Sequence, residues 1–195
     1  MTTGVIFLIV LAVVGFFCVS VFNGLVTLRN HFKNAFAQID VQLQRRYELI
    51  PNLVEAVKAY LGHEKDTLTQ VIAARNQAAG LEKIVAQNAG NAEAMAKLSQ
   101  AESVLTGALT KLMVVSEAYP DLKANSTIQN LMEELKSTEN RVGFARQAFN
   151  DAVMVYNIER EKFPNSIIAN TTGFQQALPL EISHVEAREP VRISF

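Results

Sequence analysis

Gly4–Phe22 reads GVIFLIVLAVVGFFCVSVF, a continuous run of mostly apolar side chains. No charged side chain occurs in it or anywhere in residues 1–28. As an α-helix the stretch would be roughly 28 Å long, close to the ~30 Å hydrocarbon thickness of a bilayer. A helix of a soluble core rarely runs this far without a polar face. A secretory signal peptide would carry a basic residue before the apolar run and a small-residue cleavage site after it, and neither pattern occurs here. The sequence therefore predicts a transmembrane anchor over residues 1–28.

Basic residues follow the apolar stretch and predict how the anchor is oriented. Arg29, Lys33, Arg45 and Arg46 stand against one acidic residue, Asp40, over the same segment. Basic flanks of transmembrane helices stay preferentially in the cytoplasm. We therefore expect a single-pass protein of the cell membrane with its N-terminus outside and its body in the cytoplasm.

The composition narrows the classes of partner. The chain has 195 residues and a formal net charge of −1, so it lacks the basic field that attracts nucleic acid, and we expect no nucleic-acid partner. The single cysteine, Cys18, lies in the apolar stretch and leaves no intramolecular disulfide to form. Glycine and proline are few, which suits long helices.

Four helices are expected after the anchor, because apolar residues recur there in steps of three and four. The first continues from the membrane to about Leu61, and the fourth would span roughly 55 Å at 1.5 Å per residue. Rods of this length predict an all-α fold, an elongated antiparallel three- to four-helix bundle over residues 29–164. The buried seam of the first helix should comprise Phe32, Phe36, Ile39, Leu43, Ile50, Val54, Val57 and Leu61.

Local signals mark the helix ends. Pro120 should stop the third helix, and Pro164 the fourth. Ser126 with Gln129 three residues later suggests a capping box at the start of the fourth helix. Within the first helix, Pro51 removes a backbone donor, so we expect a kink or short break near Ile50. Asn52 would then cap the restarted helix, although the kink could also serve as a partner-binding site.

The last segment has a different character. Glycine and prolines interrupt any helix there, and residues 191–195 alternate apolar and polar side chains. The sequence predicts an extended tail over residues 165–195. We expect it to dock on the bundle or on a neighbouring subunit, because five apolar side chains would otherwise be exposed. These are Phe174, Leu178, Leu180, Ile182 and Val185.

Arg46 falls on the apolar seam of the first helix, where an unpaired charge would cost several kcal/mol. It should therefore find a carboxylate on a facing helix, and the candidates are Glu139 and Glu117. The alternative is that these side chains extend along the helix surface to solvent. We expect a structural polar layer that sets the register of the helices. Its members would be Asp40, Arg45, Arg46, Glu117, Glu139, Arg141 and Arg146, with Arg141 or Arg146 pairing to Asp40.

Several segments carry a resemblance to a known family. Residues 39–54 read IDVQLQRRYELIPNLV, residues 117–125 read EAYPDLKAN, and residues 138–141 read TENR. In this order and spacing the sequence resembles the LemA family of bacterial membrane proteins. The resemblance implies an N-terminal transmembrane helix and a long helical bundle, without an established enzymatic activity. Some relatives are implicated in intracellular membrane organelles, which implies a role in membrane organisation.

No catalytic, cofactor-binding or metal-binding residue is expected. His31, His63 and His184 lie far apart and lack the spacing of metal ligands. Nucleophile motifs and phosphate-binding glycine loops do not occur.

Three functions compete. The first is a membrane-anchored scaffold or adaptor that contacts lipid and self-assembles or recruits an unidentified membrane protein. Exposed small-residue faces at Ala73, Ala74, Ala78 and Ala79 would let copies approach closely. The second is a membrane-remodelling protein whose bundle lies on the bilayer. The third is an enzyme or small-molecule sensor with a site between helices, near residues such as Arg46, Glu139 and Asn157.

Overall fold

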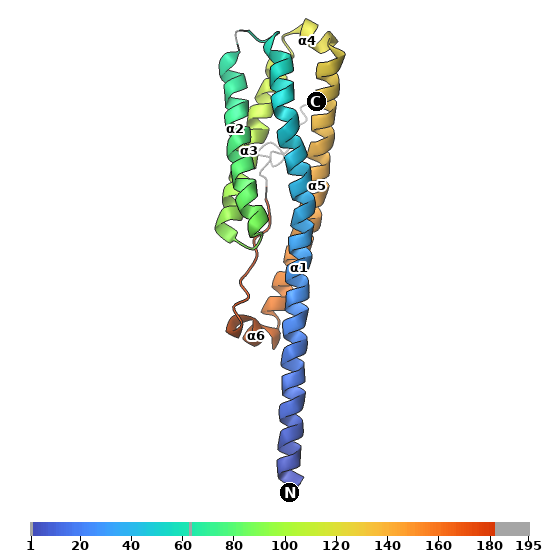
Figure 1. The fold of residues 1–195 in the computed structure, drawn as a ribbon, viewed down its shortest axis with the longest axis vertical. Coiled ribbons are helices and arrows are strands. Elements are labelled where there is room, and N and C mark those ends of the chain that lie inside the picture. The colour runs from blue at the N-terminus through green and yellow to red at the C-terminus, as the bar shows by residue number, and fades with distance from the viewer. Residues whose placement is uncertain (1, 63, 182–195) are drawn as a thin grey trace, which may run out of the picture.

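The computed structural model describes residues 2–62 and 64–181, and these form six helices and no strand, so the predicted all-α class is confirmed. Figure 1 shows α1 along the whole length of the molecule, with the α2–α3 hairpin on one side of its upper half and α5 on the other. The short α4 lies at the top, and α6 lies beside α1 lower down. The helices are α1 (Thr2–Lys58), α2 (Lys65–Gln87), α3 (Ala92–Ser116), α4 (Pro120–Ala124), α5 (Ser126–Glu161) and α6 (Asn165–Thr171).

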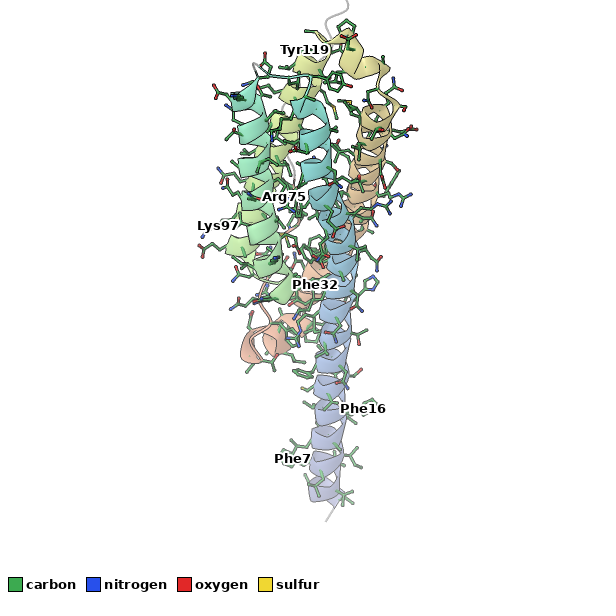
Figure 2. The ribbon with its side chains drawn as sticks, turned by 45° about the horizontal axis from the view of Figure 1, so that its top comes forward. Phe7, Phe16, Phe32, Arg75, Lys97 and Tyr119 are labelled. Atoms are coloured by element: carbon green, nitrogen blue, oxygen red, sulfur yellow. The ribbon has the colours of Figure 1, made fainter. Side chains whose placement is uncertain are left out.

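The N-terminal third of α1 extends beyond the bundle. None of its most apolar 18-residue window is buried inside the protein, and in the described part of the chain α1 is the one helix long and apolar enough to cross a membrane. Figure 2 shows Phe7 and Phe16 on this bare end, with no other element beside them. They are 65% and 79% exposed. Apolar surface of this extent is suited to lipid rather than water.

Aromatic side chains join the bundle part of α1 to α5. The ring of Phe36 lies 5.6 Å from that of Phe149, and the ring of Phe32 lies 5.0 Å from that of Tyr156. All four side chains are buried, as are the eight seam positions expected in the first helix. The pairing of low-numbered residues of α1 with high-numbered residues of α5 makes the two helices antiparallel. The predicted bundle is therefore confirmed.

Pro51 lies inside α1, which continues on both sides of it, so the expected short break is absent and Asn52 does not restart a helix. Proline cannot donate to the carbonyl four residues earlier, which is that of Tyr47. Arg75 of α2 supplies the missing donor, because its Nε donates to the Tyr47 carbonyl oxygen at 2.9 Å. Ile50 and Leu53 on either side of the proline are buried. Packing and this substitute hydrogen bond together keep the helix continuous.

The start of α5 differs from the expected capping box. Asn125, not Ser126, is the N-cap, and its side chain accepts hydrogen bonds from the backbone N–H groups of Thr127 and Ile128 at 3.0 and 3.2 Å. Gln129 instead donates to the carbonyl of Lys123. Asparagine is as good an N-cap as serine and lies one residue earlier, so it takes the position.

The tail is extended only in part. Residues 165–171 form α6, which the sequence reasoning missed, and Gly173 with a φ of 77° reverses the chain after it. The segment 174–181 then runs along the bundle, with Phe174 and Leu180 buried. The expected docking is thus confirmed for Phe174 and Leu180, whereas Leu178, which was expected to be covered as well, is 38% exposed. The predictions for Ile182, Val185 and residues 191–195 concern residues outside the described part of the chain.

Candidate functional site

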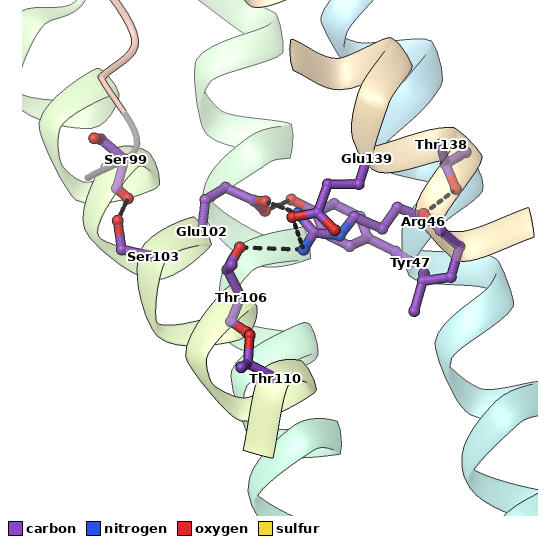
Figure 3. A network of polar contacts seen from close by, with 10 residues as sticks. Arg46, Tyr47, Ser99, Glu102, Ser103, Thr106, Thr110, Thr138 and Glu139 are labelled. Carbon is purple, nitrogen blue, oxygen red and sulfur yellow. Dashed lines mark hydrogen bonds and ion pairs between the residues drawn. The ribbon is translucent and has the colours of Figure 1, made fainter. Parts of the chain in front are cut away.

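A buried polar layer crosses the middle of the bundle, and Arg46 lies at its centre. The Arg46 side chain is 2% exposed, so it does not extend to solvent. Its Nη1 lies 2.9 Å from Oε2 of Glu102 on α3, and its Nη2 donates to Oγ1 of Thr106 at 3.1 Å. Figure 3 shows these side chains converging from α1 and α3, with Glu139 approaching Arg46 from α5. One charged side chain thereby joins three helices.

Glu102 accepts from two neighbouring residues of α1. Arg46 donates to one oxygen of the Glu102 carboxylate, and the hydroxyl of Tyr47 donates to the other. Glu102 is fully buried, and this burial raises its pKa although the Arg46 charge and the Tyr47 hydrogen bond oppose the rise. The pKa of Tyr47 is raised as well, first by burial and then by the Glu102 charge. The tyrosine therefore remains a donor at any physiological pH.

The expected partners of Arg46 are only partly correct. Glu139 contributes, but at 4.0 Å and with its side chain 38% exposed. Glu117 does not reach the layer and pairs with Lys123 on the surface at 3.7 Å. Arg46 therefore pairs mainly with Glu102 of α3 rather than with Glu139 of α5, because Glu102 lies deeper in the bundle. The polar layer of the structure, used in this sense below, consists of Arg46, Tyr47, Glu102, Thr106 and Glu139.

The other basic residues expected in the layer lie outside it. Arg45 is exposed and pairs with Glu134 on the surface of α5. Arg141 and Arg146 form no ion pair with Asp40 in the described chain; Arg141 is exposed and lines a surface groove of about 300 Å³. Asp40 accepts from Gln44 of its own helix. Arg45 and Arg141 reach solvent from the outer faces of their helices, where no buried partner is needed.

Glu82 of α2 lies close to Asp40 and is 1% exposed. Its Oε1 has no hydrogen-bond partner in the structure. Burial, followed by hydrogen bonding to Asp40 and repulsion by its carboxylate, together raise the Glu82 pKa to about 8. The side chain therefore carries a proton at neutral pH, which lowers the cost of burying it.

Two of the buried carboxylates could have been found in the sequence. Glu102 lies four residues after Leu98 and three before Leu105, so it shares their face of α3. Glu82 has the same relation to Ala78 and Val85 of α2. Both positions belong to the buried stripe once that stripe is drawn wider than a strict heptad seam. A glutamate that lies four residues after one apolar residue and three before another is therefore the sequence signal for a buried carboxylate.

The arrangement is suited to structure rather than to catalysis. Arg46 and Glu102 form a pair that is closed to solvent, so neither is free to meet a substrate. The Nε of Arg46 is buried without a hydrogen-bond partner in the described chain. No group of three or more potential metal ligands occurs in residues 2–62 and 64–181. Asn157, which the sequence reasoning placed near a site between helices, instead exchanges two hydrogen bonds with the backbone of Ala177 at 2.8 and 3.1 Å.

Comparison with known proteins places these features in a family. The model of the LemA family matches residues 35–195, which include every member of the polar layer. The magnetosome proteins MamQ 1 and MamQ 2 of Paramagnetospirillum magneticum are each 29% identical over 185 residues, covering 86% of this chain and 68% of theirs. The magnetosome protein MamQ of Magnetospirillum gryphiswaldense is 25% identical over 170 residues, covering 80% of this chain and 62% of its own.

Proposed function

This chain belongs to the LemA family, and from that premise we propose that it is a non-enzymatic, membrane-anchored helical scaffold whose copies assemble side by side in the bilayer. An exposed apolar stripe on the outer face of α5 supports the proposal. Phe144 is 74% exposed, and Val155 and Ile158 are 44% and 46% exposed. Together with the exposed Ala148 these residues form the α5 stripe, which has the heptad steps of a helix–helix contact, interrupted by Asp151.

The anchor favours such an assembly. Copies held by α1 in one membrane have parallel axes and their α5 stripes at the same height, so that a second copy meets the matching surface without searching other orientations. Val41 of α1 is also exposed, by 58%, and the antiparallel register of α1 and α5 puts it at about the level of Phe144. The two side chains would widen the contact.

The faces that the sequence suggested for self-assembly are less suitable. Ala74 and Ala78 are buried against other helices of the same chain, and Ala79 is partly covered. Ala73 is the one exposed member of that set of four. The contact between copies is therefore assigned to α5 rather than to α2.

An upright scaffold accounts for the geometry better than a bundle that lies on the bilayer. Figure 1 shows α1 continuing from the bare end into the bundle as one rod, so that insertion of the end directs the bundle away from the membrane. The relatives named as magnetosome proteins support a role in membrane organisation. Arg29 and Lys33 directly after the apolar stretch support a cytoplasmic bundle.

Exchanging Phe144 for glutamate should separate the copies. A charge in the contact would have to be buried without a partner, so we expect the association constant to fall at least tenfold. The measurement is sedimentation of the full chain in mild detergent over a range of concentrations. Val114→Glu is the matched control, because Val114 is 66% exposed on α3 and away from the stripe. An unaltered chain that sediments as a single copy at every concentration would refute self-assembly.

Crosslinking in intact cells then identifies the partner. A Phe144→Cys variant in a Cys18→Ser background places one thiol on the α5 stripe. An adduct with the mass of two copies supports self-assembly, whereas an adduct with a different protein would replace it by an adaptor role.

A further inference from the structure

The turn from α5 into the tail carries no charge. Residues 163–180 contain no Asp, Glu, Lys or Arg, which is the second such stretch of the chain after residues 1–28. In a surface segment of a water-exposed bundle, charged side chains would be expected. The two charge-free stretches are far apart in the sequence, so their relative position in the structure is informative.

The structure brings the two stretches together. The ring of Phe174 lies 5.5 Å from that of Phe22, the last residue of the apolar stretch, in an edge-to-face arrangement. The guanidinium of Arg29, the first charged residue of the chain, lies 5.0 Å from the centre of the same ring. α6 therefore lies beside α1 at the height where the apolar stretch ends (Figure 1). This is the height of the membrane surface if α1 is inserted.

One face of this turn is buried and the other is free. Ala169 is fully buried and Phe174 is 4% exposed. On the free face Phe163 is 82% exposed and Ile167 is 59% exposed. Side-chain hydrogen bonds to the backbone join the turn to α5, because Asn165 donates to the Glu159 carbonyl at 3.1 Å and Arg160 donates to the Phe174 carbonyl at 2.8 Å. Phe163 and Ile167 are therefore exposed on the free face of a turn that is held against α5.

We propose that Phe163 and α6 form a membrane foot that inserts into the boundary between lipid headgroups and acyl chains, next to the point where α1 enters the bilayer. An apolar face lying in that boundary is stabilised by burial of its side chains in lipid. The adjacent Asn170, Thr171 and Thr172 are polar and uncharged, which suits the headgroup layer. The foot gives the bundle a second membrane contact, and with it a defined tilt and rotation about α1.

The foot depends on insertion of α1 but not on the contact between copies, so the two proposals can fail separately. The experiment uses the full chain with Cys18→Ser, reconstituted in phosphatidylcholine vesicles that contain lipids spin-labelled near the headgroup end of the acyl chain. A fluorescent nitrobenzoxadiazole group is attached at Ile167→Cys. Phe163→Cys provides a second site in case the first variant folds poorly.

Two reference positions define the outcomes. Val10→Cys lies in the middle of the apolar stretch, and Val114→Cys lies on α3 at 66% exposure, far from the foot. We expect fluorescence at position 167 or 163 to be quenched at least twofold and shifted to the blue, with no effect at 114. If 167 and 163 behave like 114 while 10 still shifts to the blue, the foot is refuted. If position 10 also behaves like 114, both the anchor and the foot are refuted.

Discussion

Replacing Glu102 with alanine is expected to lower the free energy of unfolding by about 3–5 kcal/mol, because Arg46 would remain buried without its main partner. The Glu139 carboxylate, at 4.0 Å and partly exposed, is too distant to replace the 2.9 Å contact. The hydroxyl of Tyr47 would lose its acceptor as well. The measurement is denaturant unfolding of the full chain in detergent, followed by circular dichroism of the helices.

Two further variants separate the cost of a broken pair from the net value of the pair. Glu93→Ala removes an exposed carboxylate of the same helix that pairs with Lys97, and should leave stability almost unchanged. A double variant with Arg46→Leu and Glu102→Leu should recover most of the lost stability, since apolar side chains of similar volume fill the same space. If Glu102→Ala is no worse than Glu93→Ala, the polar layer does not stabilise the bundle.

The double variant also tests the register role of the layer. A buried charge pair that selects one alignment of helices can be removed with a gain in stability and a loss of specificity. A gain in stability alone would therefore not exclude this role. Unchanged melting together with unchanged assembly would count against it.

The second large effect is a loss of stability with rising pH, which Glu82→Gln should reduce strongly. The folded protein holds the Glu82 proton up to a pKa of about 8, whereas an unfolded chain releases it near the ordinary value of 4.5. Between these two values the folded state binds a proton that the unfolded state lacks, so stability falls as the pH rises, and above pH 8 it levels off. Over this window we expect a decrease on the order of 2–4 kcal/mol.

Unfolding curves at pH 5, 7 and 9 test this expectation. Glutamine keeps the shape of the side chain but cannot ionise, so the Glu82→Gln chain should be more stable than the unaltered chain at pH 9 and similar at pH 5. Glu93→Gln, at an exposed site, should keep the pH dependence of the unaltered chain. Parallel pH profiles for the unaltered chain and Glu82→Gln would show that another group causes the decrease.

The main features of the fold could be predicted because long helices depend on a repeated pattern. Every expected seam position of α1, from Phe32 to Leu61, is buried, since steps of three and four leave one possible inner face. The anchor was equally evident, because an uncharged apolar stretch of that length has few other structures available. Each of these two predictions depends on a pattern of many residues, so one residue that departs from the pattern does not change the result.

Features that depend on one contact were harder to predict. Arg46 was correctly expected to be buried, but the choice between carboxylates on different helices depends on the depth and rotation of α3, which a stripe of apolar residues does not specify. Pro51 predicts a kink or short break, and the break is absent. The sequence does not show that Arg75 lies beside the carbonyl that the proline leaves free. α6 has a weak helical sequence rich in Asn and Thr, and burial of Ala169 against the bundle stabilises it.

We infer that one unbroken helix, α1, both crosses the bilayer and forms the core of the bundle. The direct test is the distance between spin labels at Val13→Cys and Val41→Cys in a Cys18→Ser chain reconstituted in lipid nanodiscs, measured by double electron–electron resonance. Both positions are well exposed, at 62% and 58%, and α1 carries them 28 residues apart. A continuous helix predicts one narrow distance centred near 42 Å, at 1.5 Å per residue. A broad distribution, or one centred well below that value, would show that the anchor and the bundle are separate bodies.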